Sequence, residues 1–258
     1  MEERAMTDSL TLSYLNLFAV LGALKPLCEM VPEAAALIAD KQISLGIAVK
    51  GGPSATLRFE RGTVEISEGI DRCDIKLPFS SPEKFNGMID GTVTPIPSKG
   101  FTKIGFLTGP FIKLTDLLTR YLRPDEADLK NESFFQTSTK LMLYVIANAV
   151  AQIGNHEKIG QASASYMVDG SVCLSVKDDV AVAINVRNHH LTVLPQAPAL
   201  SEAMSYMEFD DLKIARELFD GKRNAVASVG EGLIRIGGMI SQVDNVNRIL
   251  DRVALYLA

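Results

Sequence analysis

Residues 204–221 read Met-Ser-Tyr-Met-Glu-Phe-Asp-Asp-Leu-Lys-Ile-Ala-Arg-Glu-Leu-Phe-Asp-Gly, and they repeat the pattern of a stretch that ends at Gly91, 130 positions before Gly221. In both copies an alternating apolar run leads to Ser or Asp residues that can cap a helix. The helix then carries apolar residues at i, i+3 and i+4, and it ends at an Asp-Gly pair, where glycine tolerates the left-handed conformation. A strand, a capped helix and a terminal glycine recur at one spacing, which predicts an internal duplication.

The start of each repeated helix carries capping residues. Ser80 and Glu83 have the spacing of a capping box, and Pro82 suits the first turn of a helix. Asp210 and Asp211 supply acidic caps in the second copy. The sequence therefore predicts that both helices begin at these residues.

The length of 258 residues allows one or two domains, and the duplication favours two. A polar and acidic segment over 124–132 is the best place for a boundary between them. We therefore predict two units, 1–127 and 128–258. The content of 47% apolar and 22% charged residues is that of an ordinary globular protein, with enough apolar material for two cores.

The charge pattern argues against some classes of partner. The formal net charge is −5, Lys and Arg are spread along the chain without a basic tract, and Trp is absent. Nucleic acids and strongly anionic membranes attract clustered Lys and Arg. We therefore do not expect nucleic acid as a partner.

An apolar stretch over residues 10–24 could be mistaken for the core of a signal peptide. The preceding residues 1–6 are net acidic, and Ser13 and Asn16 interrupt the apolar run. A counterpart over 141–150 lies in mid-chain, where a targeting signal has no place. No run reaches the ~18–20 unbroken apolar residues of a spanning helix. We expect a buried structural helix, no transmembrane segment and a cytoplasmic protein.

Periodicity predicts the same order of elements in both halves. In the first half we expect helices over 8–24 and about 33–40, three antiparallel strands within 43–66, a strand over 74–79, a helix over 81–90, a loop over 92–99, a last strand over 100–106 and a helix over about 109–123. In the second half we expect helices over about 134–152 and within 154–167, strands over 170–177, 179–187 and 190–195, the repeated strand and helix, a strand over 232–238 and a final amphipathic helix.

Several short motifs stand in this order. They are Asp74-Ile75-Lys76-Leu77, a Ser-started helix ending in Asp90-Gly91, a Gly-x-x-Lys-Ile run from Gly100 to Ile104, and, in the second copy, Asp220-Gly221 with Gly232-Leu233-Ile234-Arg235-Ile236-Gly237-Gly238. The pattern resembles the sterol carrier protein family of small lipid-binding domains, over roughly 30–123 and 155–258. The resemblance implies an α+β fold in two tandem units, each a mixed, mostly antiparallel five-stranded sheet with helices packed on one face.

The resemblance also implies an apolar tunnel between sheet and helices that holds a fatty acyl chain, a sterol or a similar ligand. In the first unit the implied ligand-binding residues are Leu77, Phe79, Phe85, Met88, Ile89, Ile104, Leu114, Leu117 and Leu118. In the second unit they are Met207, Phe209, Leu218, Phe219, Ile236, Met239, Val243, Val246 and Leu250. The chain ends Tyr-Leu-Ala rather than in a peroxisomal tripeptide, which suits a bacterial cytoplasmic protein.

The sequence shows no catalytic, cofactor or metal signature. His189 and His190 are adjacent at a turn into a strand, where neighbouring side chains point to opposite faces, so joint metal ligation is not expected. Cys28, Cys73 and Cys173 have unrelated spacings, which favours buried free thiols in a reducing compartment. An acyl-thioester hydrolase would need a nucleophile and a base, and no such pair is visible. We expect no enzyme activity, no cofactor and no metal.

Two functional hypotheses follow. The first is the non-enzymatic binding or transfer of an apolar ligand in a tunnel of each unit, with the C-terminal helix of the unit loosening for ligand exchange. The alternative is a structural or regulatory interaction module with filled cores. The Met and Phe residues of the predicted stripes fit both hypotheses, because they fill cores as readily as they line adaptable cavities. Co-purifying lipid would discriminate between the two. Transient membrane contact and homo-oligomer formation stay open.

Overall fold

The computed structural model describes residues 7–257, and the chain divides into two compact units, Met1–Thr137 and Ser138–Ala258. Each unit contains one β-sheet with helices packed against it, which confirms the α+β fold class. The division falls inside helix α7 (Glu132–His156), shortly after the boundary at 127/128 that the sequence predicts.

The sheet of unit 1 has four strands in the order β3-β2-β1-β4. They are β1 (Gln42–Val49), β2 (Ser54–Glu60), β3 (Thr63–Glu68) and β4 (Ile75–Phe79). Short turns join β1, β2 and β3 as an antiparallel meander, whereas β4 pairs in parallel with β1. The register sets Leu45 opposite Leu57 and Ile47 opposite Leu77, so one face of the sheet is apolar and buried.

A continuous helical run from Ser9 to Met30 opens unit 1. It consists of α1 (Ser9–Tyr14), a π-helical stretch (Leu15–Val20), a 3₁₀ turn (Leu21–Ala23) and α2 (Leu24–Met30). Pro26 lies within this run, in α2, and the helix continues through it. In a regular α-helix the N–H of residue 26 would bond to the carbonyl of Gly22, but proline has no N–H. Gly22 lies in the 3₁₀ turn, where the regular α-helical pattern is already interrupted. α1 packs on α4 (Pro82–Ile89), and α2 packs on β3.

The caps of the repeated helices differ in one detail from the prediction. α4 is capped by Ser81, whose hydroxyl accepts a hydrogen bond from the Lys84 N–H, and not by Ser80. In the second copy Asp211 accepts from the Ile214 N–H and caps α9 (Leu212–Phe219), as predicted. Both helices therefore begin at equivalent positions.

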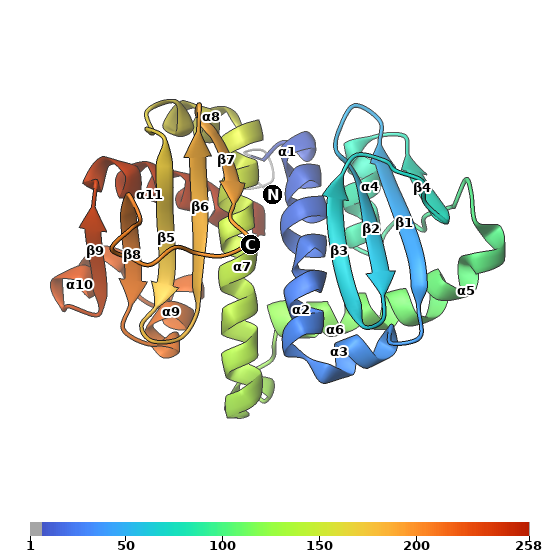
Figure 1. The fold of residues 1–258 in the computed structure, drawn as a ribbon, viewed down its shortest axis with the longest axis horizontal. Helices are drawn as coiled ribbons and strands as arrows, with labels where there is room; N and C mark the ends of the chain where they lie inside the picture. The colour runs from blue at the N-terminus through green and yellow to red at the C-terminus, as the bar shows by residue number, and fades with distance from the viewer. Residues whose placement is uncertain (1–6, 258) are drawn as a thin grey trace. The chain divides into compact units, whose positions relative to one another are not determined.

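The sheet of unit 2 has five strands in the order β7-β6-β5-β8-β9. They are β5 (Gly170–Val176), β6 (Ala181–Arg187), β7 (His190–Val193), β8 (Ser205–Phe209) and β9 (Ile234–Gly238). Besides α7 and α9, the unit contains α8 (Lys158–Ser165), α10 (Ala225–Gly230) and α11 (Ile240–Leu257). In Figure 1, α9 and α11 lie behind this sheet, while the connection from β7 to β8 crosses in front of it.

The two sheets share one topology over their first four strands. β5, β6 and β7 form an antiparallel meander and β8 pairs in parallel with β5, as β4 does with β1. β9 then adds to β8 in the antiparallel direction. This agreement of order and direction is the structural counterpart of the repeat in the sequence.

The prediction of a fifth strand in unit 1 is wrong. Residues 101–122 form a succession of helical turns: a 3₁₀ turn (Phe101–Lys103), α5 (Ile104–Phe106), a π-helical stretch (Leu107–Phe111) and α6 (Ile112–Leu122). The fifth strand is reduced to one bridge between Lys76 and Lys99. Pro95 and Pro97 precede this bridge, and without N–H groups they cannot extend a ladder.

Gly100 and Gly238 occupy equivalent positions at the edge of each sheet. Gly100 has φ +87° and a Cβ there would lie 2.4 Å from the Asp74 carbonyl oxygen, while Gly238 has φ +79° and a Cβ would lie 2.2 Å from the Met204 carbonyl oxygen. Asp74 and Met204 are 130 positions apart and the two glycines are 138 apart, so the second copy holds eight more residues before this point. The motif around Gly100 therefore corresponds to Gly238 and not to Gly232.

The Asp74 carboxylate fixes the start of β4. It accepts hydrogen bonds of 2.9 Å from both the N–H and the hydroxyl of Ser44 in β1, and it forms an ion pair with Lys103. These contacts lower the pKa of Asp74, with the hydrogen bond from Lys103 as the largest cause and those from Ser44 adding to it against the effect of burial. The carboxylate thus ties β4, β1 and the turn after Gly100 together.

The stability that Asp74 gives to unit 1 should depend on pH. Its pKa in the folded protein lies below the unfolded value of about 3.9, so its contribution is fully present above that value and is lost as the pH falls through the folded pKa. Asp74→Asn should therefore destabilise the unit at neutral pH, and the difference from the wild type should shrink in acid. Urea unfolding from pH 7 down to about pH 2.5 measures this difference. A constant difference across that range would contradict the assignment.

Candidate ligand-binding site

The residues that the resemblance assigns to unit 1 lie on β4, α4, α5 and α6. The Phe79 and Phe85 rings meet edge to face with 5.3 Å between their centroids. Met88 and Ile89 are half-buried at the end of α4, and Ile104 lies in α5, 45% exposed, rather than on a strand. The remaining members are buried: Leu77, Phe79, Phe85, Leu114, Leu117 and Leu118.

The interior of unit 1 also holds three aromatic rings that lie outside the predicted set of ligand-binding residues. Phe59 of β2 meets Phe106 at 5.0 Å and Phe111 at 6.0 Å between ring centroids, and all three are buried. The predicted strand over 100–106 includes Phe106, whereas the structure places it in α5, in a helical relation to the residues that follow. Phe111, Leu114 and Leu118 continue one stripe at steps of three and four, and this period was the signal that could have found them. The rings fill the space between β2 and the last helix of the unit.

In unit 2 the assigned residues range from the core to the surface. Met207 and Phe209 of β8 and Val243 and Val246 of α11 are buried. Met239, just before α11, is 40% exposed. The half-buried members come from α9, the edge strand β9 and the side of α11: Leu218, Phe219, Ile236 and Leu250. The register puts Ile236 opposite Met207, so strand β9 continues the apolar face of β8 to the edge of the sheet.

A buried hydroxyl lies on the same face of β8. Ser205 is 0% exposed, and its Oγ has no hydrogen-bond partner within residues 7–257. The register pairs Ser205 with Val172 of β5 and with Gly238 of β9. Ser205 and Met207 therefore project to the same side of the strand. A buried hydroxyl without a partner is unfavourable for the protein alone, and it can bond to a polar group that is brought to it.

The inner face of α11 differs slightly from the predicted stripe. Ile249 (0% exposed) and Tyr256 are buried, whereas Leu250 lies at the side of the helix. The face also carries buried polar residues, among them Arg252, which forms an ion pair of 2.9 Å with the buried Glu157. The 3.6-residue period fits either set of apolar positions, so only the packing decides between them.

All three cysteines are buried and free, as predicted, and burial raises the pKa of the Cys28 thiol to about 11 and also that of Cys173. His189 and His190 are exposed at the turn between β6 and β7, and the His189 Nδ1 lies 3.2 Å from the Met167 carbonyl oxygen. Residues 7–257 contain no group of three or more His, Cys, Asp or Glu side chains placed to hold a metal ion.

One helical run within residues 7–257, Ser9–Met30, is long and apolar enough to cross a membrane by length and composition alone. The buried helix of a globular core passes the same test. Leu17, Leu24 and Leu27 of this run are each 0% exposed.

Comparison with known proteins gives matches among solved structures only. No family model matches the chain, and no curated protein matches it. A UbiJ-SCP2 ubiquinone synthesis protein is 14% identical with a TM-score of 0.33, over 43% of this chain and 97% of its own. A conserved hypothetical protein from Thermus Thermophilus, suggested to be a sterol carrier protein, is 19% identical with a TM-score of 0.33, over 44% of this chain and 86% of its own.

Proposed function

We propose that unit 2 binds an apolar small molecule, such as a fatty acyl chain or another lipid, between its sheet and the helices α9 and α11, without catalysing a reaction on it. The observation that carries the proposal is the incomplete burial of apolar side chains on this side of the sheet: Ile236, opposite the buried Met207, and Phe219 are half-buried, and Met239 is exposed. Each methylene group that moves from water into such a site contributes about 0.8 kcal/mol.

The Ser205 hydroxyl gives this site a polar anchor. It is buried on the same face as Met207 and has no partner among the described residues. A ligand with a carbonyl, carboxyl or hydroxyl group would complete its hydrogen bonding. Apolar pockets with a few placed polar groups are the usual form of small-molecule sites. Ligand exchange would then require α11 to separate from β9 at the half-buried edge.

Unit 1 fits the second function, that of a filled structural module. Phe59, Phe106 and Phe111 pack between β2 and the last helical segment of the unit with mutual ring contacts. Close aromatic packing leaves no reason for a ligand there, because protein interiors tolerate few voids. We therefore propose one ligand per chain. The cytoplasmic location expected from the sequence is part of this proposal.

Native mass spectrometry of freshly purified protein, followed by solvent extraction, tests the proposal directly. One bound lipid-sized mass per chain would support a carrier with one working unit. Two bound masses per chain would contradict the assignment of unit 1 as filled. Protein that carries no such mass and also fails to bind a fluorescent fatty acid such as cis-parinaric acid would contradict ligand binding altogether.

Leu218→Asp should weaken binding of cis-parinaric acid at least about 100-fold, because it places an ionised carboxylate on the apolar wall of the site. Leu218 is half-buried in α9, so the substitution leaves the deeper core of unit 2 in place. The measurement is a fluorescence titration, with circular dichroism to verify folding.

Met88→Asp is the matched control, because Met88 holds the equivalent position in α4 and is also half-buried. It should leave the affinity unchanged. A second variant, Ser205→Ala, removes only a hydroxyl without a partner and should weaken binding about threefold to tenfold while the ligand-free protein keeps its stability. Full affinity in Leu218→Asp, or equal losses in Leu218→Asp and Met88→Asp, would place the ligand elsewhere.

A further inference from the structure

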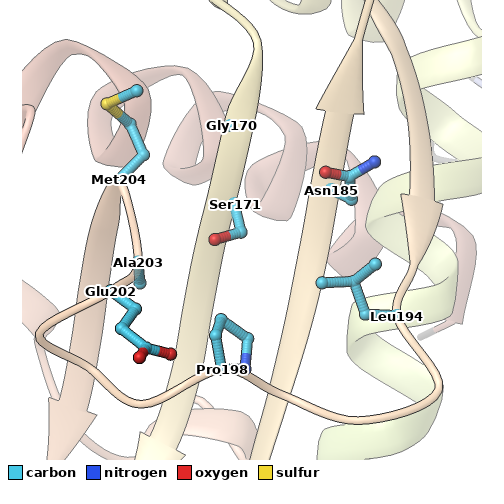
Figure 2. Close-up of a pocket in the computed structure, with 8 residues that line it drawn as sticks. All are labelled: Gly170, Ser171, Asn185, Leu194, Pro198, Glu202, Ala203 and Met204. Carbon is cyan, nitrogen blue, oxygen red and sulfur yellow. The ribbon is translucent and has the colours of Figure 1, made fainter.

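The sheet of unit 2 has a second face, turned away from α9 and α11, that is built from small side chains. Alternation along β5 and β6 turns Ser171, Cys173, Ala183 and Asn185 to this side, which we call the outer face. Cys173 and Ala183 are 0% exposed. Residues 194–204, which connect β7 to β8, cross the outer face as an arch (Figure 2). The arch therefore supplies the cover that the helices give to the opposite face.

The arch is held to the sheet at both ends and in the middle. The Leu194 N–H donates to the Ala183 carbonyl at 2.9 Å, and the Cys173 Sγ lies 4.0 Å from the Pro198 carbonyl oxygen. At the far end the Met204 side chain lies on Gly170, where a Cβ would come within 2.9 Å of the Met204 Cβ. These contacts define the space beneath the arch.

A pocket of about 600 Å³, largely open to solvent, lies between the arch and the outer face. Leu194, Pro198 and Met204 give it apolar walls, and Ser171, Asn185 and Glu202 give it polar ones. Figure 2 shows Ser171 and Asn185 on neighbouring strands, with Glu202 and Pro198 on the arch that crosses them. A volume of this size is within the range of small-molecule pockets. None of the residues assigned to the helix side of the sheet lines it.

Unit 1 has the same two sheet positions, and there they are satisfied internally. The registers make Ser44 and Arg58 the counterparts of Ser171 and Asn185. Ser44 bonds to Asp74 at 2.9 Å, and Arg58 bonds to Asp71 at 2.9 Å. The crossing segment of unit 1 spans only residues 69–74, and it lies directly on the sheet, with the Cys73 Sγ 2.8 Å from where a Gly46 Cβ would be.

Unit 2 lacks these partners, and its crossing segment is longer. Met204 stands at the position of Asp74, and the arch has eleven residues, 194–204, where unit 1 has six, 69–74. Within residues 7–257, the side chains of Ser171, Asn185 and Glu202 make no hydrogen bond or ion pair. The two units can therefore be compared directly. In unit 1 the outer face is filled, whereas in unit 2 a pocket remains in which a hydroxyl, a carboxamide and a carboxylate are available to a ligand.

We propose that this pocket is a binding site for a small cationic amphiphile, a protonated amine with a compact apolar body. The Glu202 carboxylate attracts the ammonium group, and the lining contains no Lys or Arg to oppose it. The Ser171 hydroxyl and the Asn185 carboxamide oxygen accept its remaining N–H donors. Leu194, Pro198 and Met204 cover the apolar body. The site is separate from the proposed lipid site, because it lies on the other face of the sheet.

The test uses ¹⁵N-labelled full-length protein titrated with three probes that share one apolar body: hexylamine, hexanol and hexanoate. We expect amide chemical shifts to change at Ser171 and Asn185, with affinity in the order hexylamine, hexanol, hexanoate. Glu202→Gln should lower the affinity for hexylamine about twofold to fivefold and leave that for hexanol unchanged, because it removes only the charge. Asn185→Ala should weaken hexylamine about threefold to tenfold.

Glu126→Gln is the matched control for net charge, since Glu126 is exposed and lies in unit 1. It should change none of the affinities. Leu218→Asp should also leave the hexylamine shifts unchanged, so a failure of the lipid site and a failure of this site can be told apart. Three results would each overturn the proposal: hexanoate that shifts Ser171 and Asn185 with the same affinity as hexylamine, no effect of Glu202→Gln on the hexylamine shifts there, or no hexylamine shifts at Ser171 and Asn185.

Discussion

Replacing Arg252 by Met should destabilise unit 2 by about 3–5 kcal/mol, because it leaves a buried carboxylate without its partner. The side chains of Arg252 and Glu157 are 10% and 8% exposed, and their charged atoms are 2.9 Å apart. Glu157 also accepts the Gly160 N–H at 2.7 Å and so caps α8. The substitution therefore removes the cation of the ion pair between α8 and α11. It keeps the hydrogen bond by which Glu157 caps α8.

Guanidinium unfolding followed by circular dichroism measures this loss. Arg248→Met is the control, since Arg248 lies one turn earlier on α11 and its pair with Asp244 is exposed on both sides. It should change the free energy of unfolding by no more than about 0.5 kcal/mol. The double variant Glu157→Gln, Arg252→Met removes both charges and should recover part of the loss. If Arg248→Met and Arg252→Met lower the free energy of unfolding equally, the burial of the Arg252–Glu157 pair does not determine its contribution to stability.

Substituting Gly238→Ala should cost about 2–4 kcal/mol of stability in unit 2, because two effects add at this position. The backbone has φ +79°, and an added Cβ would lie 2.2 Å from the Met204 carbonyl oxygen and 2.7 Å from the Ser205 Cα. Backbone atoms cannot give way as a flexible side chain can. The edge strand β9 would have to separate from β8, or the turn into α11 would have to change.

Gly221→Ala is the matched control for Gly238→Ala. Gly221 also has a positive φ, +67°, but an added Cβ would meet no atom within 4 Å. Only the conformational penalty remains there, about 1 kcal/mol. Thermal unfolding of the two variants separates two costs: the steric clash of the added Cβ, which only Gly238→Ala has, and the strain of a left-handed backbone, which both variants have. If both variants lose the same stability, the close approach to Met204 has no energetic consequence.

Much of the fold follows from local patterns. The alternation around Leu45, Leu57 and Leu174 predicts the meanders, since residues at i and i+2 of a strand share a face. The Asp-Gly pairs at 90–91 and 220–221 predict where α4 and α9 end, because glycine accepts the left-handed conformation without strain. The duplication, two units and buried cysteines are likewise visible in the residues, since each depends on a spacing or a composition that the chain carries by itself.

The tertiary structure alone decided the features that depend on distant partners. Residues 100–106 can form a strand or a helix by pattern. The edge of β4 is open to them, but pairing stops at the single bridge of Lys99 after Pro95 and Pro97, and helical turns form instead. The choice between Ile249 and Leu250 on α11 depends on which side meets the sheet. The outer-face pocket depends on side-chain partners that unit 2 lacks. In the sequence, Ser171 and Asn185 look like ordinary strand residues. The register shows that their counterparts Ser44 and Arg58 bond to acidic residues, whereas Ser171 and Asn185 do not. Local spacing determines which elements form, whereas hydrogen bonds and volumes between distant residues determine which faces are filled and which stay open.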